Sequence, residues 1–466
     1  MTGNISRRRF SRRDFLKLGG GVLGTAVASA LLPRSKALLA PMRVESQVQA
    51  LKPVQGALAA AADIPPDFHF VATDGWIHLP PEAEVAPYHP DNMAPELLTT
   101  YIFGFTNVTG LSTEQVYAQK MKAQLTAPIF SLQVGHEPGW VLKLTNLGLA
   151  IRPDLIDAHT LHFHGFRNAL PIFDGEPHSS VGVPIVRDLN YFYKPHDPGT
   201  YMYHCHFEET EHVHMGMVGG CFIKPDDWRP DNKYAYGLRD LAYGQGPPRD
   251  DPVVAHSAYD REYVMTLNEV WSEAHWADSH VQLPEWSDYA PEFWLLNGRV
   301  YPDTIAPNGW RAASTDGGEL TTKATYEKLQ FQPISSLVHC KSQERVLLRL
   351  INLGFEEQSL KLTGLKLHVI AKDATLLRGT NGEDLTYMTD TVLIGPGQSV
   401  DAIFVAPEVS EMTKLLLYNR KYGRLSNGGH TGYGGQMTEI HVYPGDTTLS
   451  SQSEPNEWPS ELVPEV

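Results

Sequence analysis

The chain has 466 residues, which is long enough for two or three domains. Its formal net charge is −16, from 38 basic and 54 acidic residues, and this excess of acid argues against nucleic acid and anionic membrane surfaces as partners. With 3 cysteines the chain cannot build a disulfide framework.

Residues 1–30 are predicted to form a twin-arginine signal peptide. SRRDFLK at 11–17 fits the twin-arginine pattern, and a glycine-rich apolar stretch follows that is too short for a good membrane span. A cleavage site of the A-x-A type ends at Ala30. We therefore expect export to the periplasm or the extracellular space, with no membrane association after processing. This route carries folded proteins and suits a protein that takes up a cofactor before it crosses the membrane.

The remaining chain predicts an all-β protein of two β-sandwich domains. Short alternating strands with glycine and proline punctuation recur, and helix signals are sparse. The predicted organisation, in chain order, is a flexible arm (31–64), a first sandwich (65–228), a linker (229–259), a second sandwich (260–445) and an acidic tail (446–466).

Two stretches of the first predicted sandwich combine residues that bind copper. They are HTLHFHG at 159–165 and HCH at 204–206, with further histidine and methionine residues behind the second. Two histidines, one cysteine and a weak axial methionine are the ligands of a blue-copper electron-transfer site. In this chain such a set would be His159, Cys205, His212 and Met217.

Strand alternation predicts a second cluster on the opposite face. Side chains two residues apart share a face of a strand, so four histidines should lie on the face opposite to the cysteine side chain. These four are His162, His164, His204 and His206. Since Cys205 is covalently joined to both flanking histidines, an electron at the cysteine face could cross to a second metal through a few bonds.

Some of these residue types also have other interpretations. Zinc also binds cysteine and histidine, but the chain has no CxxC pair of the kind that structural zinc sites use. Isolated histidines are expected at the surface or satisfied in the core; they are His136, His178, His196 and His256. Cys221 lies in an apolar run and is interpreted as a small buried hydrophobe, while Cys340 has no assigned role.

The second half repeats the first without its ligands. WVLKLTNLG at 140–148 matches RVLLRLINLG at 345–354. We align Gly364 with Gly165, and Tyr418 with Tyr203. The HxxHxH positions then hold Gln358, Lys361 and Thr363, and the HCH positions hold Asn419, Arg420 and Lys421. We therefore expect the chemistry in the first half.

These motifs resemble the multicopper oxidase superfamily, which includes laccases, two-domain laccases and copper nitrite reductases. The resemblance rests on HFHG (162–165), DGEP (174–177), GTYMYHCH (199–206), LNGRVYP (296–302) and DTVLIGPG (390–397). It implies two cupredoxin-like Greek-key domains. It also implies type 1 copper on His159, Cys205, His212 and Met217, with the other four histidines at type 2 and type 3 positions.

The chain departs from the family pattern in two places. Five residues rather than three separate HCH from the next histidine, so His212 and His214 both remain candidates for the type 1 site. The second domain lacks the four histidines that would complete a trinuclear cluster, so the four-histidine face could hold one copper or two. His162 also stands where nitrite reductases carry an aspartate.

The sequence therefore predicts an exported, copper-dependent oxidoreductase that passes electrons from type 1 copper to a second copper site. The expected donor is a small molecule or a protein, and Glu208 and Glu209 are candidate proton donors. An electron carrier or copper-binding protein with type 1 copper only, and a divergent nitrite reductase, are the alternatives. In two-domain relatives a neighbouring chain closes the histidine face, so a homotrimer is expected.

Overall fold

The structure is a computed structural model that describes residues 65–167, 169–225, 240–243, 251–308, 312–313, 320–321 and 324–462. The predicted signal peptide and the predicted arm lie outside these residues. Within the described ranges, no helix has the length and apolar character that crossing a membrane requires.

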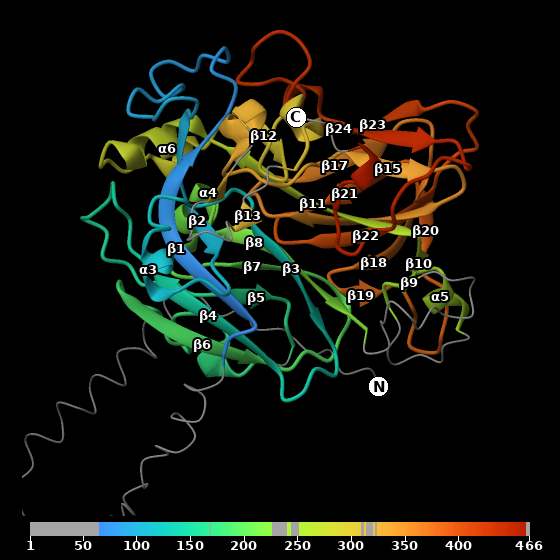
Figure 1. Ribbon diagram of the computed structural model, residues 1–466, viewed down its shortest axis with the longest axis horizontal. Helices are drawn as coiled ribbons and strands as arrows, with labels where there is room; N and C mark the ends of the chain where they lie inside the picture. The colour runs from blue at the N-terminus through green and yellow to red at the C-terminus, as the bar shows by residue number, and fades with distance from the viewer. Residues whose placement is uncertain are drawn as a thin grey trace, which may run out of the picture. The chain divides into compact units, whose positions relative to one another are not determined.

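Two four-stranded sheets pack face to face in the first half (Figure 1). One has the order β2 (Thr100–Asn107), β1 (Phe68–Ile77), β4 (Trp140–Asn146), β6 (Arg187–Tyr193). The other has the order β3 (Ala127–Gln133), β8 (Val218–Lys224), β7 (Gly199–His204), β5 (His162–His164). Alternating aromatic and aliphatic side chains from both sheets, such as Phe70, Leu144 and Tyr203, fill the core between them.

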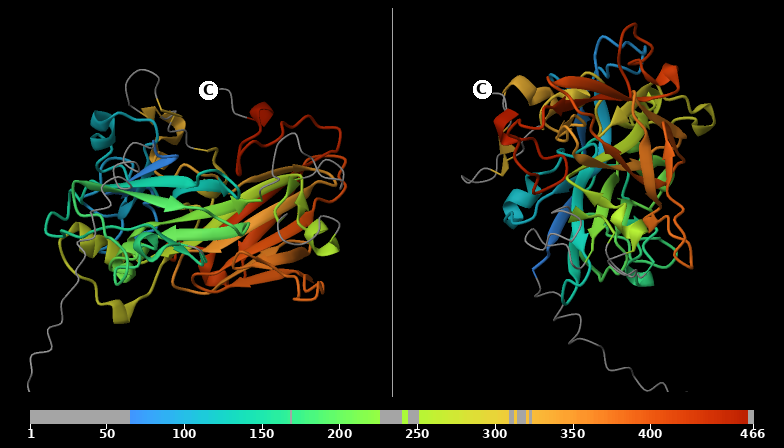
Figure 2. Two further views of the ribbon diagram at one scale, coloured as in Figure 1. Left: turned by 90° about the horizontal axis from the view of Figure 1, so that it is seen from below. Right: turned by 90° about the vertical axis from the view of Figure 1, so that its right-hand side faces the viewer.

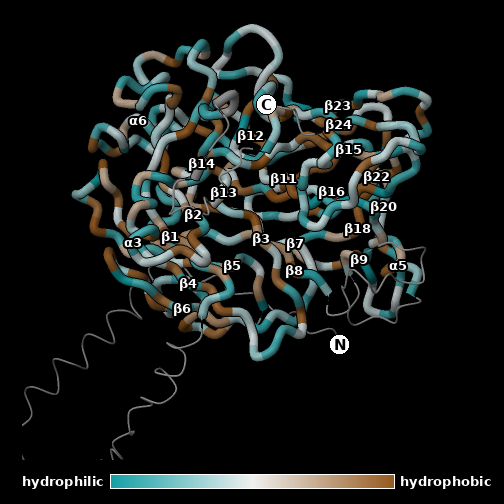
Figure 3. The backbone as a smooth tube through the Cα atoms, viewed as in Figure 1, coloured by the Kyte–Doolittle hydropathy of each residue, from teal (hydrophilic) through white to brown (hydrophobic). Residues whose placement is uncertain are grey.

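The second half contains two larger sheets. The first has the order β12 (Phe293–Leu296), β11 (Arg261–Val270), β16 (Arg345–Asn352), β22 (Ser399–Val405), β18 (Leu367–Lys372), β19 (Thr375–Leu376), with β20 (Tyr387–Thr389) also on β18. The second has the order β15 (Val338–Lys341), β24 (Met437–Tyr443), β23 (Thr413–Asn419), β17 (Gln358–Leu362), β21 (Thr391–Ile394). Hydrophobic stretches follow the strands of both halves (Figure 3).

The remaining elements are short. Two small ribbons pair β9 (Asp240–Leu241) with β10 (Ala258–Tyr259), and β13 (Ala312–Ala313) with β14 (Leu320–Thr321). The α-helices are α3 (Thr113–Tyr117), α4 (Glu209–Met215), α5 (Pro252–Ala255) and α6 (Ser272–Ser279). The 3₁₀ turns are η1 (Pro171–Phe173), η2 (Trp286–Asp288), η3 (Asp303–Ile305), η4 (Ala324–Leu329), η5 (Tyr422–Arg424) and η6 (Ser460–Leu462).

The two halves share one strand topology, which confirms the predicted all-β fold of two sandwiches. In the first half β1 runs parallel to β4, and β3 runs parallel to β8. In the second half β11 runs parallel to β16, and β15 runs parallel to β24. The other neighbours in these rows are antiparallel, so each strand of the first sandwich has a counterpart in the second.

The repeated Asn-Leu-Gly turn is held in the same way in both halves. Asn146 and Asn352 each accept a hydrogen bond from the glycine two residues on, at 2.8 and 3.1 Å. Behind each turn a buried carboxylate accepts backbone N–H groups and one tyrosine hydroxyl. Asp74 accepts Tyr101 at 2.7 Å, and Glu269 accepts Tyr289 at 2.9 Å. The turn residues therefore carry a structural role that the repeat in the sequence indicates.

The segments predicted as linker and tail both pack against the second sandwich where they are described. Tyr243 and Tyr259 are buried, and β10 pairs with β9. In the tail, Asn456 bonds both backbone groups of Val264, at 2.8 and 3.0 Å. Apolar and amide side chains in these segments provide this packing. The sequence did not predict it because Asp, Pro and Gly residues dominate the composition of the segments.

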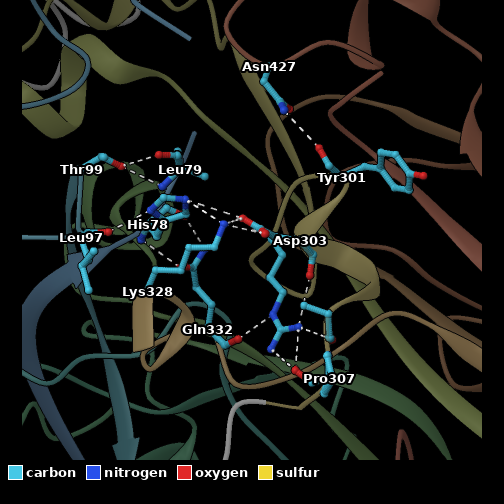
Figure 4. A network of polar contacts seen from close by, with 12 residues as sticks. His78, Leu79, Leu97, Thr99, Tyr301, Asp303, Pro307, Lys328, Gln332 and Asn427 are labelled. Atoms are coloured by element: carbon cyan, nitrogen blue, oxygen red, sulfur yellow. Dashed lines mark hydrogen bonds and ion pairs between the residues drawn. The ribbon is translucent and has the colours of Figure 1, made fainter. Parts of the chain in front are cut away.

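A polar network ties the end of β1 to the second half (Figure 4). The backbone of His78 exchanges two hydrogen bonds of 2.9 Å with the side chain of Gln332. Lys328 lies between the His78 ring, at 3.4 Å, and the carboxylate of Asp303, at 2.8 Å. These partners lie about 250 positions apart in the chain, so the network joins the two sandwiches.

A second network clamps β7, the strand that leads to the HCH segment. The hydroxyl of Thr200 donates to Asp401 of β22 at 2.6 Å and accepts from Arg349 of β16 at 3.0 Å. The hydroxyl of Ser399 donates to the carbonyl of Thr200 at 2.6 Å. Strands of the two halves lie side by side in both views of Figure 2, and this clamp fixes β7 against the second sandwich.

Candidate metal centres

The first candidate centre is a buried cluster of one thiol and two imidazoles. The ligand atoms of His159, Cys205 and His212 all lie within 4.8 Å of one another. The Cys205 Sγ atom is 3.8 Å from Nδ1 of His159 and 3.4 Å from Nδ1 of His212. The same nitrogen of both rings therefore faces the sulfur.

Three separate segments of the chain bring these side chains together. His159 lies outside any strand, in an isolated bridge with Val183. Cys205 follows the last residue of β7, and His212 lies on α4. Past this helix the chain turns back at Met217, whose carbonyl accepts from the Cys205 backbone at 3.0 Å and whose N–H donates to His212 at 2.9 Å. Met217 is fully buried beside the cluster.

The structure separates the two histidines that the sequence left as alternatives. His214 points away from Cys205 into a group of rings from the second half, with centroids 5.0 Å from His275 and 5.4 Å from Tyr289. Its Nε2 accepts the backbone N–H of Trp271 at 3.3 Å. On helix α4, His212 thus faces the Cys205 thiol and His214 faces the ring group of the second half. The helix also accounts for the five residues between the HCH segment and His212.

The electrostatics of the cluster favour a bound cation. Burial alone would raise the pKa of the Cys205 thiol, but the rings of His212 and His159 hold that pKa well below its ordinary value. Against the effect of burial, the thiolate and the Asp157 carboxylate raise the pKa of His212 to about 10. A buried thiolate beside two imidazole nitrogens is a donor set that fits copper, and the metal charge would replace the proton.

Asp157 is a neighbour of this centre that sequence reasoning missed. Its Oδ2 lies 3.6 Å from Nε2 of His212, and neither atom has a hydrogen-bond partner among the described residues. Such a carboxylate would orient the ring and increase its basicity. Its position two residues before His159 is visible in the sequence, but the spacing alone does not show which ring it faces.

The second candidate centre lies on the other face of β5 and β7. His162 pairs with His204, and Phe163 pairs with Tyr203 on the core side. Ligand atoms of His162, His164 and His204 lie within 4.8 Å of one another. The alternation predicted from the sequence holds for these strands, although β5 covers only residues 162–164 and β7 ends at His204.

Backbone carbonyls orient two of these rings. Nδ1 of His162 lies 2.6 Å from the carbonyl of Asp174, and Nδ1 of His204 lies 2.9 Å from the carbonyl of Cys205. A ring that donates through Nδ1 presents Nε2 as the free ligand atom. Burial lowers the pKa of His204 to about 3, so this imidazole stays neutral and available to a metal.

The ring of His206 lies beside this group, although His206 is not among the residues whose ligand atoms all lie within 4.8 Å of one another. Its ring centroid is 4.8 Å from that of His162 and 5.3 Å from that of His204. Nδ1 of His206 lies 3.1 Å from the carboxylate of Glu209. Of the two candidate proton donors, Glu209 therefore neighbours the four-histidine face, whereas Glu208 caps α4 in a left-handed conformation.

The second half holds hydrogen-bonded amides where the first centre would be. Gln358 of β17 pairs with Ile394 as His159 pairs with Val183. Asn419 donates to Gln358 at 2.9 Å and to Gln436 at 2.6 Å. Its backbone N–H bonds the Gln436 carbonyl at 3.0 Å, as Cys205 bonds Met217. Gln358, Asn419 and Gln436 thus take the places of His159, Cys205 and Met217.

This geometry corrects the sequence alignment by one residue. Lys361 pairs with Tyr418 as His162 pairs with His204, so Tyr418 answers His204 rather than Tyr203. Asn419 and Arg420 then answer Cys205 and His206, and Lys421 falls outside the segment. The expectation that these positions carry no histidine or cysteine is unchanged.

Comparisons with known proteins also indicate that this chain is a copper protein. Multicopper oxidase family models match residues 142–227 and 261–413, just over half of the chain. The solved structure of the blue copper oxidase from Nitrosomonas europaea is 19% identical, with a TM-score of 0.50 over 80% of this chain and 85% of that chain. The multicopper oxidase mgLAC is 18% identical, with a TM-score of 0.52 over 82% and 87%. No curated protein sequence matches the chain.

The fold, the ligand chemistry and the family matches agree. Two sandwiches of one topology match the fold of multicopper oxidases, and His/Cys groups of the first sandwich could hold metal. The chain therefore belongs to the multicopper oxidase superfamily and is a copper-dependent oxidoreductase built from two cupredoxin-like domains.

Proposed function

We propose that the first domain holds type 1 copper on one face and a catalytic copper site on the other. His159, Cys205, His212 and Met217 would hold the type 1 ion; His162, His164, His204 and His206 would hold the second. Copper would supply one-electron redox chemistry at both positions. The observation that carries this proposal is the HCH segment, which contributes Cys205 to one ligand group and His204 to the other.

The chain's own residues would connect and shield the two sites. Cys205 is fully buried, so its thiolate is removed from water and from competing reactions. The peptide of residues 204–206 links the two ligand groups covalently, and the His204 ring bonds back to the Cys205 carbonyl at 2.9 Å. Glu209, close to His206, would hold a proton near the second face.

We further propose that the protein works outside the cytoplasm and as a homotrimer. The twin-arginine pattern at 11–17 supports export. Assembly with a neighbouring chain is supported by β5, which carries His162 and His164 and is the edge strand of its sheet. The donor would be a small molecule or a protein. Light scattering on the copper-loaded protein at micromolar concentration tests the assembly: three chains are expected, and a fully loaded monomer would contradict it.

The catalytic role of the second face is tested by the double variant His162→Ala/His164→Ala. Both side chains point away from Cys205, so the variant should stay blue and still accept electrons from a donor. It should lose turnover with its terminal acceptor because half of the ligands are gone. Retained turnover would show that the second site is not catalytic and would favour an electron carrier.

A further inference from the structure

A pocket of about 340 Å³ opens beside the four-histidine face. Its first-domain wall includes His164, Thr200 and Met202. Its other wall comes from the second domain of the same chain and includes Asp373, Gly397 and Gln398. The second domain thus encloses space next to one of the proposed catalytic ligands.

The second-domain wall is held in place by a constrained turn. Asp373 and Ala374 connect β18 to β19 with φ values of +47° and +53°, a conformation that residues other than glycine rarely adopt. Asp373 and Ser399 exchange two hydrogen bonds, of 2.9 and 3.1 Å. A Cβ on Gly199, at the start of β7, would lie 2.7 Å from Ala374, so the turn sits directly against the ligand strand.

Gly397 brings the same wall up to the imidazole of His164. A Cβ at this glycine would lie 3.5 Å from both Cε1 and Nε2 of that ring. The φ of +72° favours glycine, and the absence of a side chain here leaves the pocket open next to the ring. A small molecule in the pocket would therefore reach the outer edge of His164.

The one fixed charge among the residues that line the pocket is negative. Asp373 is the one carboxylate among its lining residues, and none of them is a lysine or an arginine. Lys372 lies over the ring of Tyr387, and Arg167 donates to Thr375 at 3.1 Å, so neither cation forms an ion pair with Asp373 among the described residues. A carboxylate at the wall of a confined site repels anions and leaves neutral molecules unaffected.

We propose that this pocket admits the electron acceptor to the four-histidine site, and that Asp373 makes it selective for small uncharged acceptors, of the size of dioxygen, over anions such as nitrite. The proposal rests on the proposed catalytic role of that site. The second domain would thus take part in selecting the acceptor, although its positions that align with the copper ligands carry no histidine or cysteine.

Anion binding to the oxidised, copper-loaded protein tests the role of Asp373. Azide and nitrite would be titrated against the electron paramagnetic resonance signal of the second copper in the wild type, Asp373→Asn and Asp446→Asn. Asp446 is an exposed aspartate at the start of the tail that does not line the pocket. Asp373→Asn should bind both anions roughly three- to tenfold more tightly at low salt, with the gain shrinking as salt screens the charge. Equal affinities in all three proteins would overturn the proposal.

Access is tested by filling the pocket at its glycine. Gly397→Asn places an amide beside His164 in a backbone conformation that asparagine tolerates. Gly364→Asn is the matched control, since that glycine has a φ of +73° and open space around it. Reoxidation of the reduced protein should slow several-fold in Gly397→Asn alone, while the blue colour and its reduction by a donor are unchanged. Equal reoxidation rates would contradict the pocket as the entry route.

The two proposals can fail separately. If the wild type carries no second copper signal, the proposed function itself fails. If the signal and turnover are present but neither Asp373→Asn nor Gly397→Asn differs from its control, only the acceptor pocket is refuted.

Discussion

The directions of the two α4 histidine side chains decide which of them can be a ligand at the first centre. His212 and His214 are both buried and differ by two positions, yet only His212 presents Nδ1 to the Cys205 sulfur. Residue types and strand parity in the sequence predicted that His159 and Cys205 lie together and that four histidines gather on the opposite face, and the structure has this grouping. They could not separate His212 from His214, because the longer spacing forms a helix, α4, and the helix decides which side chains face inward.

Substitution of the two α4 histidines should give opposite results. His212→Leu should abolish the blue absorption, because a nitrogen ligand beside the thiolate is lost. His214→Leu should keep the colour and lower the free energy of unfolding by about 2 kcal/mol, since the Trp271 N–H loses its acceptor. Visible spectra and denaturant unfolding of the copper-loaded variants measure both effects. A colourless His214→Leu that is still folded would reverse the assignment.

Glu269 is a buried carboxylate whose role the sequence did not indicate. Its Oε1 accepts the backbone N–H of Phe355 at 2.5 Å and that of Glu356 at 3.0 Å, beyond the Asn-Leu-Gly turn of the second domain. Burial nonetheless raises its pKa to about 7. Asp74 performs the same task in the first domain, so the repeat extends to residues that no short motif contains.

The stability of the protein should therefore depend on pH through Glu269. A carboxyl group whose folded-state pKa lies above its unfolded value stabilises most below the unfolded pKa, and this contribution is lost as pH rises through the folded pKa. Between pH 5 and pH 8 the loss should be about 2–3 kcal/mol. Denaturant unfolding of wild type and Glu269→Gln at both pH values measures it as a change in their difference. A difference that is constant with pH would refute the assignment.

At the scale of elements, pairing register is the property that the sequence determined least well. Tyr418 resembles Tyr203 in local pattern, but the ladder between β17 and β23 places it opposite Lys361, in the position of His204. A shift of one residue moves a side chain to the other face of a sheet. The partners of these strands lie about 60 residues away, so no local pattern could fix the register.

At the scale of the whole molecule, contacts between the domains carry what the sequence could not predict. The Thr200–Asp401–Arg349 clamp and the pocket with Asp373 join residues about 150 to 200 positions apart. Such contacts follow from how two sandwiches pack, whereas the fold class followed from strand patterns and repeats. The second domain thus acts as a support for β7 and as a wall beside His164.

Copper removal should lower the stability of the folded molecule. A ligand that binds only the folded state stabilises it in proportion to the logarithm of its concentration over its dissociation constant, which is about 4 kcal/mol at a thousandfold excess. The copper-free protein should unfold roughly 5 °C or more below the loaded protein by calorimetry. Cys205→Ser should show a smaller difference, and identical midpoints for loaded and copper-free wild type would contradict tight binding at either centre.

Copper analysis combined with electron paramagnetic resonance on the purified protein tests the central claim most directly. We predict at least two copper ions per chain, one with the thiolate signature of type 1 copper and another without it. In Cys205→Ser the first signal should vanish and the second should remain, because the two ligand groups lie on opposite faces of the HCH segment. A single copper per chain, or loss of both signals in that variant, would contradict two separate centres in the first domain.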